Sequence, residues 1–145
     1  MEKSSYTTKN STILVVDDDE DLRSIIRDIF LLEGFCLFEA QNGQEAFEIV
    51  RRNEIDLVIS DMRMPGGDGL SLLLNIRAYD PEKPIFLFMT GFASFSDQEL
   101  LAKGAMKVFH KPFRQDELTS YVSNILGFTR RPKGGRREKE PNKVE

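Results

Sequence analysis

The sequence predicts a single α/β domain in which a doubly wound, five-stranded parallel sheet is covered by five helices. Short apolar runs alternate with stretches in which apolar residues recur at helical spacing. The runs are rich in β-branched residues and contain few polar ones, which is typical of strands buried on both faces. Strands that alternate with helices form parallel sheets through right-handed crossovers, so the alternation indicates this fold class.

Each strand is predicted from one apolar run. The runs cover residues 13–16, 35–40, 55–60, 84–89 and 107–110. The run at 84–89 is the most apolar of the set. Because parallel strands are joined by crossovers, a helix is expected after every run.

The segments between the predicted strands carry sequence patterns that are typical of helices. Apolar residues at helical spacing begin at Leu22 and stop at Gly34, which suits a helix C-terminus. Asn42 is suited to begin the second helix, and Ser96 with Glu99 forms a capping-box pair for the fourth. The third and fifth helices are predicted from two further apolar sets: Leu70, Leu73, Leu74 and Ile76, and Leu118, Val122 and Ile125.

The length leaves room for one domain with short tails. We assign residues 12–127 to the domain, 1–11 to a polar N-terminal tail and 128–145 to a basic tail or linker. No apolar run approaches the roughly 20 residues of a membrane span, and the polar N-terminus lacks a signal-peptide pattern. The single cysteine, Cys36, excludes an internal disulfide and fits a reducing compartment. We therefore expect a cytoplasmic protein without a membrane span.

Charge is distributed unevenly around the net value of −4. Residues 129–145 carry seven Lys or Arg and three Glu, whereas the rest of the chain holds 13 basic and 21 acidic residues. An acidic body repels nucleic acid and suits the binding of a cation. We expect the basic segment to be a solvated tail or linker rather than a nucleic-acid-binding element.

Polar residues follow four of the five predicted strands. Asp17, Asp18 and Asp19 follow the first strand, Asp61 the third, Thr90 the fourth and Lys111 the fifth. The carboxyl ends of parallel strands share one edge, and ligands of such sheets bind there. Each Asp alone would also suit a turn or a helix N-cap, Asp19 in particular, so the prediction of a site depends on their co-occurrence.

The residue types at this edge fit phosphoryl chemistry. Carboxylates brought close together repel one another unless a cation compensates, and Mg²⁺ prefers oxygen ligands. The Lys111 ammonium would bind a phosphoryl oxygen, and the Thr90 hydroxyl would donate to another. Together they predict a site for a transferring phosphoryl group.

At these residues the sequence resembles the receiver domains of two-component signalling. The resemblance covers about residues 11–127 and implies a flavodoxin-like fold with strand order 2-1-3-4-5. Four segments carry it, in order: Ile-Leu-Val-Val-Asp17-Asp18-Asp19, Val-Ile-Ser-Asp61-Met-Arg-Met-Pro65-Gly-Gly-Asp-Gly69, Phe-Met-Thr90-Gly91 and Lys111-Pro112-Phe113.

The resemblance implies a metal site for Mg²⁺, which Mn²⁺ can replace. Asp18 is expected to bind the ion directly and Asp17 through a water molecule. Asp61 and the backbone carbonyl of Arg63 complete the implied set of ligands.

The resemblance also implies how the phosphoryl group is received. Asp61 is the expected phosphoacceptor, attacking a phosphohistidine of a partner. Thr90 is expected to bond the phosphoryl group and to couple it to movement of the fourth helix. Lys111 pairs with the phosphate, and its peptide bond to Pro112 is expected to be cis.

The implied function is phosphorylation-dependent signalling. A sensor histidine kinase or a histidine phosphotransfer protein would donate the group, the conformation would switch, and a downstream protein effector would respond. The chain would catalyse its own phosphorylation and a slow self-dephosphorylation, without being a classified enzyme. The resemblance also allows a homodimer through the fourth helix, fifth strand and fifth helix, and it fits a stand-alone regulator and part of a larger one equally well.

Two features depart from the family pattern. Val108 stands three residues before Lys111, where the family usually has Tyr or Phe as a reporter of phosphorylation, and Phe109 lies next to it. The segment from Thr90 to Gly104 is about one residue shorter than usual, so the fourth helix is expected to start late or to be poorly ordered. Reorientation of an aromatic side chain is therefore in doubt as the output signal.

Two other functions are kept as alternatives. Asp17 and Asp19 have the spacing of haloacid-dehalogenase-like phosphatases, but Asp21 stands where their motif has Thr or Val, and that reading leaves residues 61–65 unexplained. The second alternative is a receiver fold that acts as an interaction module and is never phosphorylated. For His110 and Cys36 we expect structural roles, with the Cys36 thiol buried.

Overall fold

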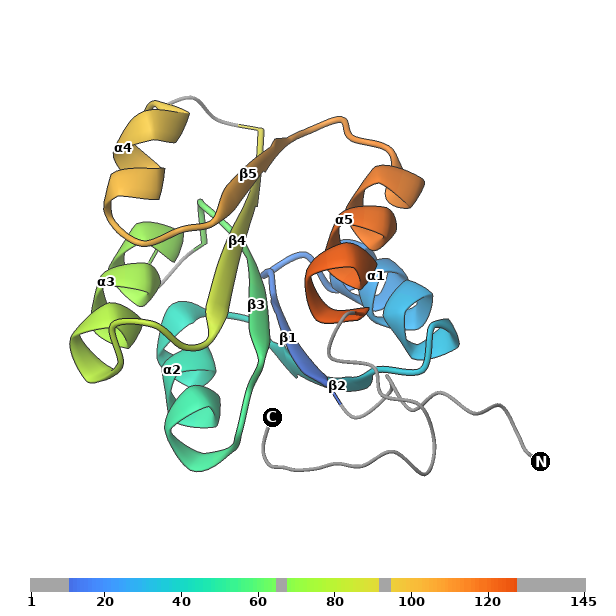
Figure 1. The fold of residues 1–145 in the computed structure, drawn as a ribbon, viewed down its shortest axis with the longest axis horizontal. Coiled ribbons are helices and arrows are strands. Elements are labelled where there is room, and N and C mark those ends of the chain that lie inside the picture. Colours follow the sequence, from blue (N-terminus) through green and yellow to red (C-terminus); the bar gives the residue numbers. More distant parts are fainter. Residues whose placement is uncertain (1–10, 65–67, 92–94, 128–145) are drawn as a thin grey trace.

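The computed structural model describes residues 11–64, 68–91 and 95–127. Within these ranges the chain alternates strictly between strand and helix (Figure 1). The strands are β1 (Thr12–Val16), β2 (Cys36–Ala40), β3 (Leu57–Asp61), β4 (Ile85–Thr90) and β5 (Lys107–His110). The helices are α1 (Glu20–Leu32), α2 (Gly43–Arg52), α3 (Gly69–Tyr79), α4 (Asp97–Ala102) and α5 (Gln115–Gly127).

All five strands are parallel, in the order β2-β1-β3-β4-β5. The predicted doubly wound sheet with five helices and this strand order is confirmed. The chain moves outward from β1 to β2 in one direction and from β3 to β5 in the other. The order therefore reverses between β1 and β3, which is where such sheets bind their ligands.

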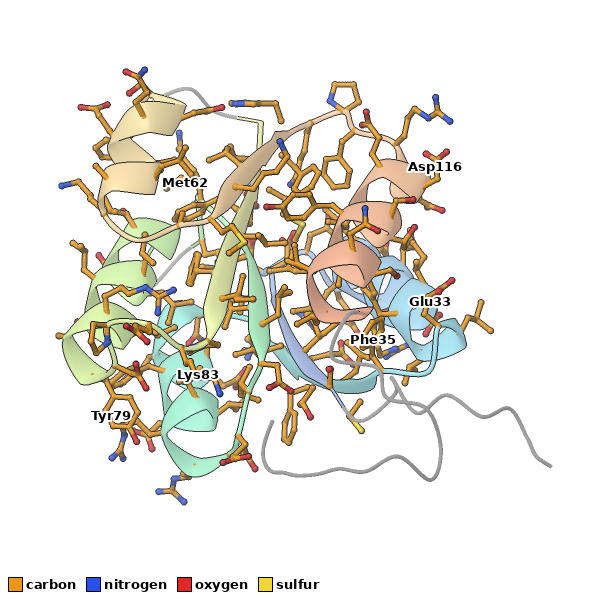
Figure 2. The ribbon with its side chains drawn as sticks, viewed as in Figure 1. Glu33, Phe35, Met62, Tyr79, Lys83 and Asp116 are labelled. Atoms are coloured by element: carbon orange, nitrogen blue, oxygen red, sulfur yellow. The ribbon has the colours of Figure 1, made fainter. Side chains whose placement is uncertain are left out.

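Side chains of the strands alternate between two apolar layers. In β1, Leu14 and Val16 belong to the layer beneath α2, α3 and α4, whereas Ile13 and Val15 belong to the layer beneath α1 and α5. Figure 1 shows these two groups of helices on opposite faces of the sheet. Figure 2 labels Met62 in the first layer and Phe35 in the second. Because both faces are covered, the central strands contain continuous apolar runs.

Helix ends follow local sequence signals. In each of four helices, the side chain before the first turn accepts a backbone N–H: Asp19, Asn42, Asp68 and Ser96. Ser96 and Glu99 form the predicted capping box. Gly34 lies just past the end of α1 with φ of 97°, a conformation that favours glycine.

Some local expectations need correction. The fourth strand begins at Ile85 rather than at Pro84, because proline has no amide hydrogen to donate to a neighbouring strand. Leu74 is exposed, and Leu72 takes the buried place on α3 instead. The Cys36 thiol is exposed rather than buried, because Cys36 begins β2 at the edge of the sheet. The fourth helix is short, with six residues beginning at Asp97.

No helix among the described residues combines the length and the apolar character that crossing a membrane requires. The predicted N-terminal tail, apart from Ser11, and the predicted C-terminal tail lie outside the described residues.

Gly69, the first residue of α3, lies where a side chain does not fit. A Cβ there would collide with the Asp61 carbonyl oxygen and come within 2.9 Å of Phe88 Cε1. Because the backbone that carries Asp61 would have to shift, we expect Gly69→Ala to lower the free energy of unfolding by about 2 kcal/mol. Urea unfolding followed by far-ultraviolet circular dichroism measures this loss.

Gly91→Ala is the matched control, because among the described residues a Cβ at Gly91 would meet only Lys111 Cβ, at an ordinary 4.0 Å. Its free energy of unfolding should change by less than about 1 kcal/mol. Equal losses in the two variants would show that the close approach at Gly69 has no energetic consequence.

Candidate functional site

Three carboxylates meet at the carboxyl edge of the sheet. Asp17 follows β1, Asp61 ends β3, and Asp18 lies one residue further along the first loop. Each offers a carboxylate oxygen, and these oxygens all lie within 4.8 Å of one another. The pairing of Val16 with Ser60 explains the meeting, because it brings the next residues of β1 and β3 to the same height. The structure thus brings together the three carboxylates that the sequence predicted for a metal site.

Asp17 is the buried member, with 1% of its surface exposed. Its Oδ1 accepts the Asp19 N–H at 2.9 Å, whereas its Oδ2 is buried without a hydrogen-bond partner among the described residues. Burial raises the pKa of the Asp17 carboxyl to about 6. The Asp19 amide opposes this rise in pKa, and the charge of Asp61 adds to it.

Asp61 is held at both carboxylate oxygens but stays accessible, with 13% of its side chain exposed. Its Oδ1 accepts the Met62 N–H at 2.8 Å, and its Oδ2 lies 3.5 Å from Lys111 Nζ. One oxygen is thus oriented by the backbone and the other faces a cation. This arrangement leaves a nucleophilic carboxylate at the surface of the edge.

Thr90 ends β4, and Lys111 directly follows β5. The Lys111 N–H donates to the Thr90 carbonyl at 2.8 Å, which joins the ends of β4 and β5. The peptide bond between Lys111 and Pro112 is cis, as expected. Thr90 is buried and follows Met89, the residue that pairs with Asp61 across the sheet. Both residues therefore lie on the edge where the sequence predicted them.

Asp19 and Arg63 complete the set of predicted residues. The Asp19 side chain accepts the N–H groups of Asp21 and Leu22 at the start of α1, so it caps a helix and lies outside the carboxylate cluster. This role removes support from the phosphatase alternative, which needs Asp19 at the reacting centre. The side chain of Arg63 is exposed in the loop after β3, and metal binding by its carbonyl stays a prediction.

The cluster has the chemistry of a site for a hard cation. Its ligands are all oxygens, and one of them, Asp17 Oδ2, is buried without a hydrogen-bond partner among the described residues. Buried polar atoms nearly always have a partner, so the orphaned oxygen indicates a ligand. Mg²⁺ satisfies carboxylate oxygens and offsets their mutual repulsion, so the residues present fit that ion.

One pair of residues near the site was not predicted from the sequence. Arg23 of α1 donates from Nη1 to the Asp17 carbonyl at 2.7 Å and from Nε to Glu39 Oε1 of β2 at 3.0 Å. A sequence signal existed, because Arg23 is the first basic residue after five consecutive acidic ones, 17–21. The partner Glu39 lies 16 positions away and carries no such signal.

The two neighbouring residues of β5 point to opposite layers. Val108 packs in the layer beneath α2, α3 and α4. Phe109 packs in the other layer, with ring centroids 5.9 Å from Phe113 and 5.5 Å from Tyr121. Phe109 therefore does not replace an aromatic residue at position 108, because its ring lies on the other side of the sheet.

Comparison with known proteins agrees with this geometry. Residues 13–123 match the family described as response regulator receiver domain. Sporulation initiation phosphotransferase F of Bacillus subtilis is 36% identical over 118 residues, which cover 81% of this chain and 94% of that protein. The regulatory protein AtoC of Escherichia coli is 35% identical, and the match covers 82% of this chain and 26% of AtoC. The chain thus spans nearly all of the first relative and about a quarter of the second.

Solved structures have the same fold. The receiver domain of the Francisella response regulator 1452 superposes with a TM-score of 0.76 at 30% identity, covering 83% of this chain and 99% of that one. TrrA of Thermotoga maritima, solved in complex with Mg²⁺ and BeF, gives a TM-score of 0.72 at 30% identity, covering 79% and 98%. The chain therefore belongs to the response-regulator receiver-domain family of two-component signal transduction.

Proposed function

We propose that the chain accepts a phosphoryl group on Asp61, in a Mg²⁺-dependent reaction, from a histidine kinase or a histidine phosphotransfer protein. The observation that carries this proposal is the position of Asp61, which is accessible, lies 3.5 Å from Lys111 Nζ and belongs to the cluster with Asp17 and Asp18. A nucleophile, a cation for the phosphoryl oxygens and a site for a metal ion are thus present at one edge.

The transfer itself needs little from the protein beyond position and charge. A carboxylate oxygen of Asp61 forms the new bond to phosphorus, and the bond between phosphorus and the donor nitrogen breaks. That electron pair stays on the imidazole of the donor, which takes up a proton. The product at Asp61 is an acyl phosphate, a mixed anhydride that water can cleave, so the modification is reversible.

The surrounding residues favour this step through charge and orientation. The Met62 N–H fixes the direction of the Asp61 carboxylate, and the Lys111 ammonium neutralises charge on the phosphoryl oxygens. A Mg²⁺ ion bound by Asp17, Asp18 and Asp61 would supply further charge neutralisation for those oxygens. The complex of the related TrrA with Mg²⁺ and BeF supports the choice of this ion. Participation of the Thr90 hydroxyl and the Arg63 carbonyl, and replacement of Mg²⁺ by Mn²⁺, are parts of the same proposal.

The partners follow from the family. A kinase or phosphotransfer protein would donate the group, and a downstream protein effector would bind the switched conformation. A related CheY of Borrelia burgdorferi, 26% identical, was solved in complex with CheX, which supports an output by protein binding. A homodimer through α4, β5 and α5 stays a prediction. The single cysteine supports a cytoplasmic location.

We expect Asp61→Asn to abolish phosphorylation, because the amide is not a nucleophile. The full chain is incubated with Mg²⁺ and acetyl phosphate and its intact mass is recorded. The wild-type protein should gain the mass of one phosphoryl group. Asp116→Asn, at an exposed position on α5, is the control and should gain it as well.

Persistence of the mass gain in Asp61→Asn would place the phosphorylation on another residue. Absence of any gain in the wild-type protein would favour the unphosphorylated interaction module instead. A gain that does not depend on Mg²⁺ would contradict the proposed role of the metal ion.

Lys111→Met is expected to slow phosphorylation by acetyl phosphate about 100-fold, because the charge that faces Asp61 Oδ2 is lost. Lys107→Met is the matched control. It removes the lysine at the start of β5, at the other end of the strand from Lys111, where Nζ lies 5.5 Å from the Phe109 ring centroid. Initial rates at saturating Mg²⁺ measure the effect, and equal rates for the two variants would exclude a role for Lys111 in the transfer.

The raised pKa of Asp17 predicts how stability depends on pH without metal. The unfolded chain loses this proton near 3.8 and the folded protein near about 6, so stability conferred by the protonated carboxyl is lost as the pH rises between these values. Asp17→Asn has no such proton to lose. Its stability advantage over the wild-type protein should therefore grow from less than about 1 kcal/mol at about pH 4 to about 3 kcal/mol above about pH 6.

Urea unfolding of both proteins in the presence of a chelator, across this pH range, measures the difference. Addition of Mg²⁺ above about pH 6 should stabilise the wild-type protein more than Asp17→Asn, since the variant has lost a ligand. A difference between the two proteins that is the same at every pH would contradict the prediction.

A further inference from the structure

We propose that Arg23, held in place by Glu39, is a positioning residue that sets the affinity of the carboxylate cluster for its divalent cation. The inference rests on the proposed function, because it concerns the same site. Arg23 itself contributes no oxygen ligand, so its action is through the backbone of the loop that carries Asp17 and Asp18.

Arg23 makes two directed contacts at once. Its Nη1 donates to the Asp17 carbonyl at 2.7 Å, and its Nε donates to Glu39 Oε1 at 3.0 Å. Only 14% of the Arg23 side chain is exposed. A largely buried guanidinium that bridges a carbonyl and a carboxylate has little freedom to reorient, because its planar fork must match both acceptors.

The Asp17 carbonyl is the first one beyond the end of β1. Strand pairing ends at Val16, and the Asp17 N–H still donates to the Ala40 carbonyl of β2 at 3.1 Å. The Asp17 carbonyl lies beyond the last paired residue of β1 and accepts a hydrogen bond from the Arg23 guanidinium. The two bonds hold Asp17 at its amide and at its carbonyl.

That carbonyl belongs to the peptide group that joins Asp17 to Asp18. Rotation of this group would change the direction of both side chains, which are two of the three members of the carboxylate cluster. The cluster needs such a restraint because its negative charges repel one another. The contact from Arg23 therefore bears directly on how well the oxygens converge on a cation.

Glu39 anchors this arrangement from β2. Its Oε1 accepts from Arg23, and its Oε2 accepts from Arg27 Nη1 at 3.0 Å. Partial burial opposes ionisation of Glu39, but the hydrogen bonds from Arg27 and Arg23 lower its pKa below the ordinary value. Glu39 thus stays charged as the pH falls and keeps Arg23 oriented.

The same carboxylate provides a matched control, because its two arginine partners differ in one respect. Arg23 and Arg27 both lie on α1 and both pair with Glu39 at 3.0 Å. Of the two, Arg23 is the one that donates to the Asp17 carbonyl, whereas the other contact of Arg27 within the described part of the chain is with Asp28. Arg27→Gln removes a comparable ion pair and leaves the loop contact intact.

The experiment compares the full chain with its Arg23→Gln, Arg23→Lys, Arg27→Gln and Glu39→Gln variants. MgCl₂ titrations followed through backbone amide chemical shifts in two-dimensional NMR give the Kd of each protein for the ion. Urea unfolding without Mg²⁺ gives the stability of each variant. Initial rates of phosphorylation by acetyl phosphate are recorded as a function of Mg²⁺ concentration.

We expect Arg23→Gln to raise the Kd for Mg²⁺ about tenfold, the size typical of residues that orient metal ligands. Its half-saturating Mg²⁺ concentration in phosphorylation should rise by the same factor, with a nearly unchanged rate at saturation. Arg23→Lys should resemble Arg23→Gln, because an ammonium cannot bridge the two acceptors as a guanidinium does. Glu39→Gln should give a smaller rise in Kd, and Arg27→Gln a change of less than about twofold.

Several results would overturn the proposal. An unchanged Kd in Arg23→Gln would exclude a positioning role, and a wild-type Kd in Arg23→Lys would assign the effect to charge alone. Equal rises in Arg23→Gln and Arg27→Gln would indicate general loosening of α1. If Arg23→Gln does not fold, Arg23→Lys and Glu39→Gln decide by the same criteria.

Failure of the inference and failure of the proposed function are distinguishable. The proposed function fails if the wild-type protein does not bind Mg²⁺ or does not gain a phosphoryl group at Asp61. The inference alone fails if the wild-type protein binds Mg²⁺ and is phosphorylated at Asp61, but substitution of Arg23 leaves the Kd for Mg²⁺ unchanged.

Discussion

The repulsion among Asp17, Asp18 and Asp61 is the constraint on which the rest of the structure depends. Their oxygens lie within 4.8 Å of one another, and Asp17 is almost fully buried. Such an arrangement opposes folding unless a cation binds, because negative charges held this close together repel one another. The apolar layers on both faces of the sheet offset this opposition. The site is thus a local instability that the core tolerates and that a divalent ion relieves.

Tolerance alone would not keep the carboxylates converged, since repelling groups move apart when the backbone allows it. Two of the three, Asp17 and Asp61, therefore have restraints on both the side chain and the backbone. Asp17 is held by the amide of Asp19 and by Arg23, and Asp61 by the Met62 amide and by the close approach of Gly69. In a preorganised cluster of this kind, the charged groups take their positions during folding. They therefore need no rearrangement when a phosphoryl group is transferred, and this makes their electrostatic stabilisation most effective.

The parts of the fold and site that the sequence predicts are those with local or periodic causes. Apolar runs that alternate with residues at helical spacing predicted the five strands. Because parallel strands share one carboxyl edge, the same pattern predicted that Asp17 and Asp61 lie close together. Arg23 was missed because its role depends on a residue of another strand, Glu39, whose register no local pattern encodes. The exposure of the Cys36 thiol was missed for a related reason, since an edge strand and a central strand have similar apolar runs.

The residues of β5 and Lys111 determine how the site is connected to α4 and α5. Because Val108 packs toward α4 and Phe109 packs toward α5, a change in an aromatic rotamer at β5 would disturb the α5 side of the sheet. The contact between the site and α4 is instead polar. Lys111 is bonded through its amide to Thr90, and the preceding residue, His110, hydrogen-bonds Asp97 in the first turn of α4 at 2.8 Å. We therefore expect a displacement of the end of β5 to reach α4 through the hydrogen bond between His110 and Asp97, without an aromatic side chain at position 108.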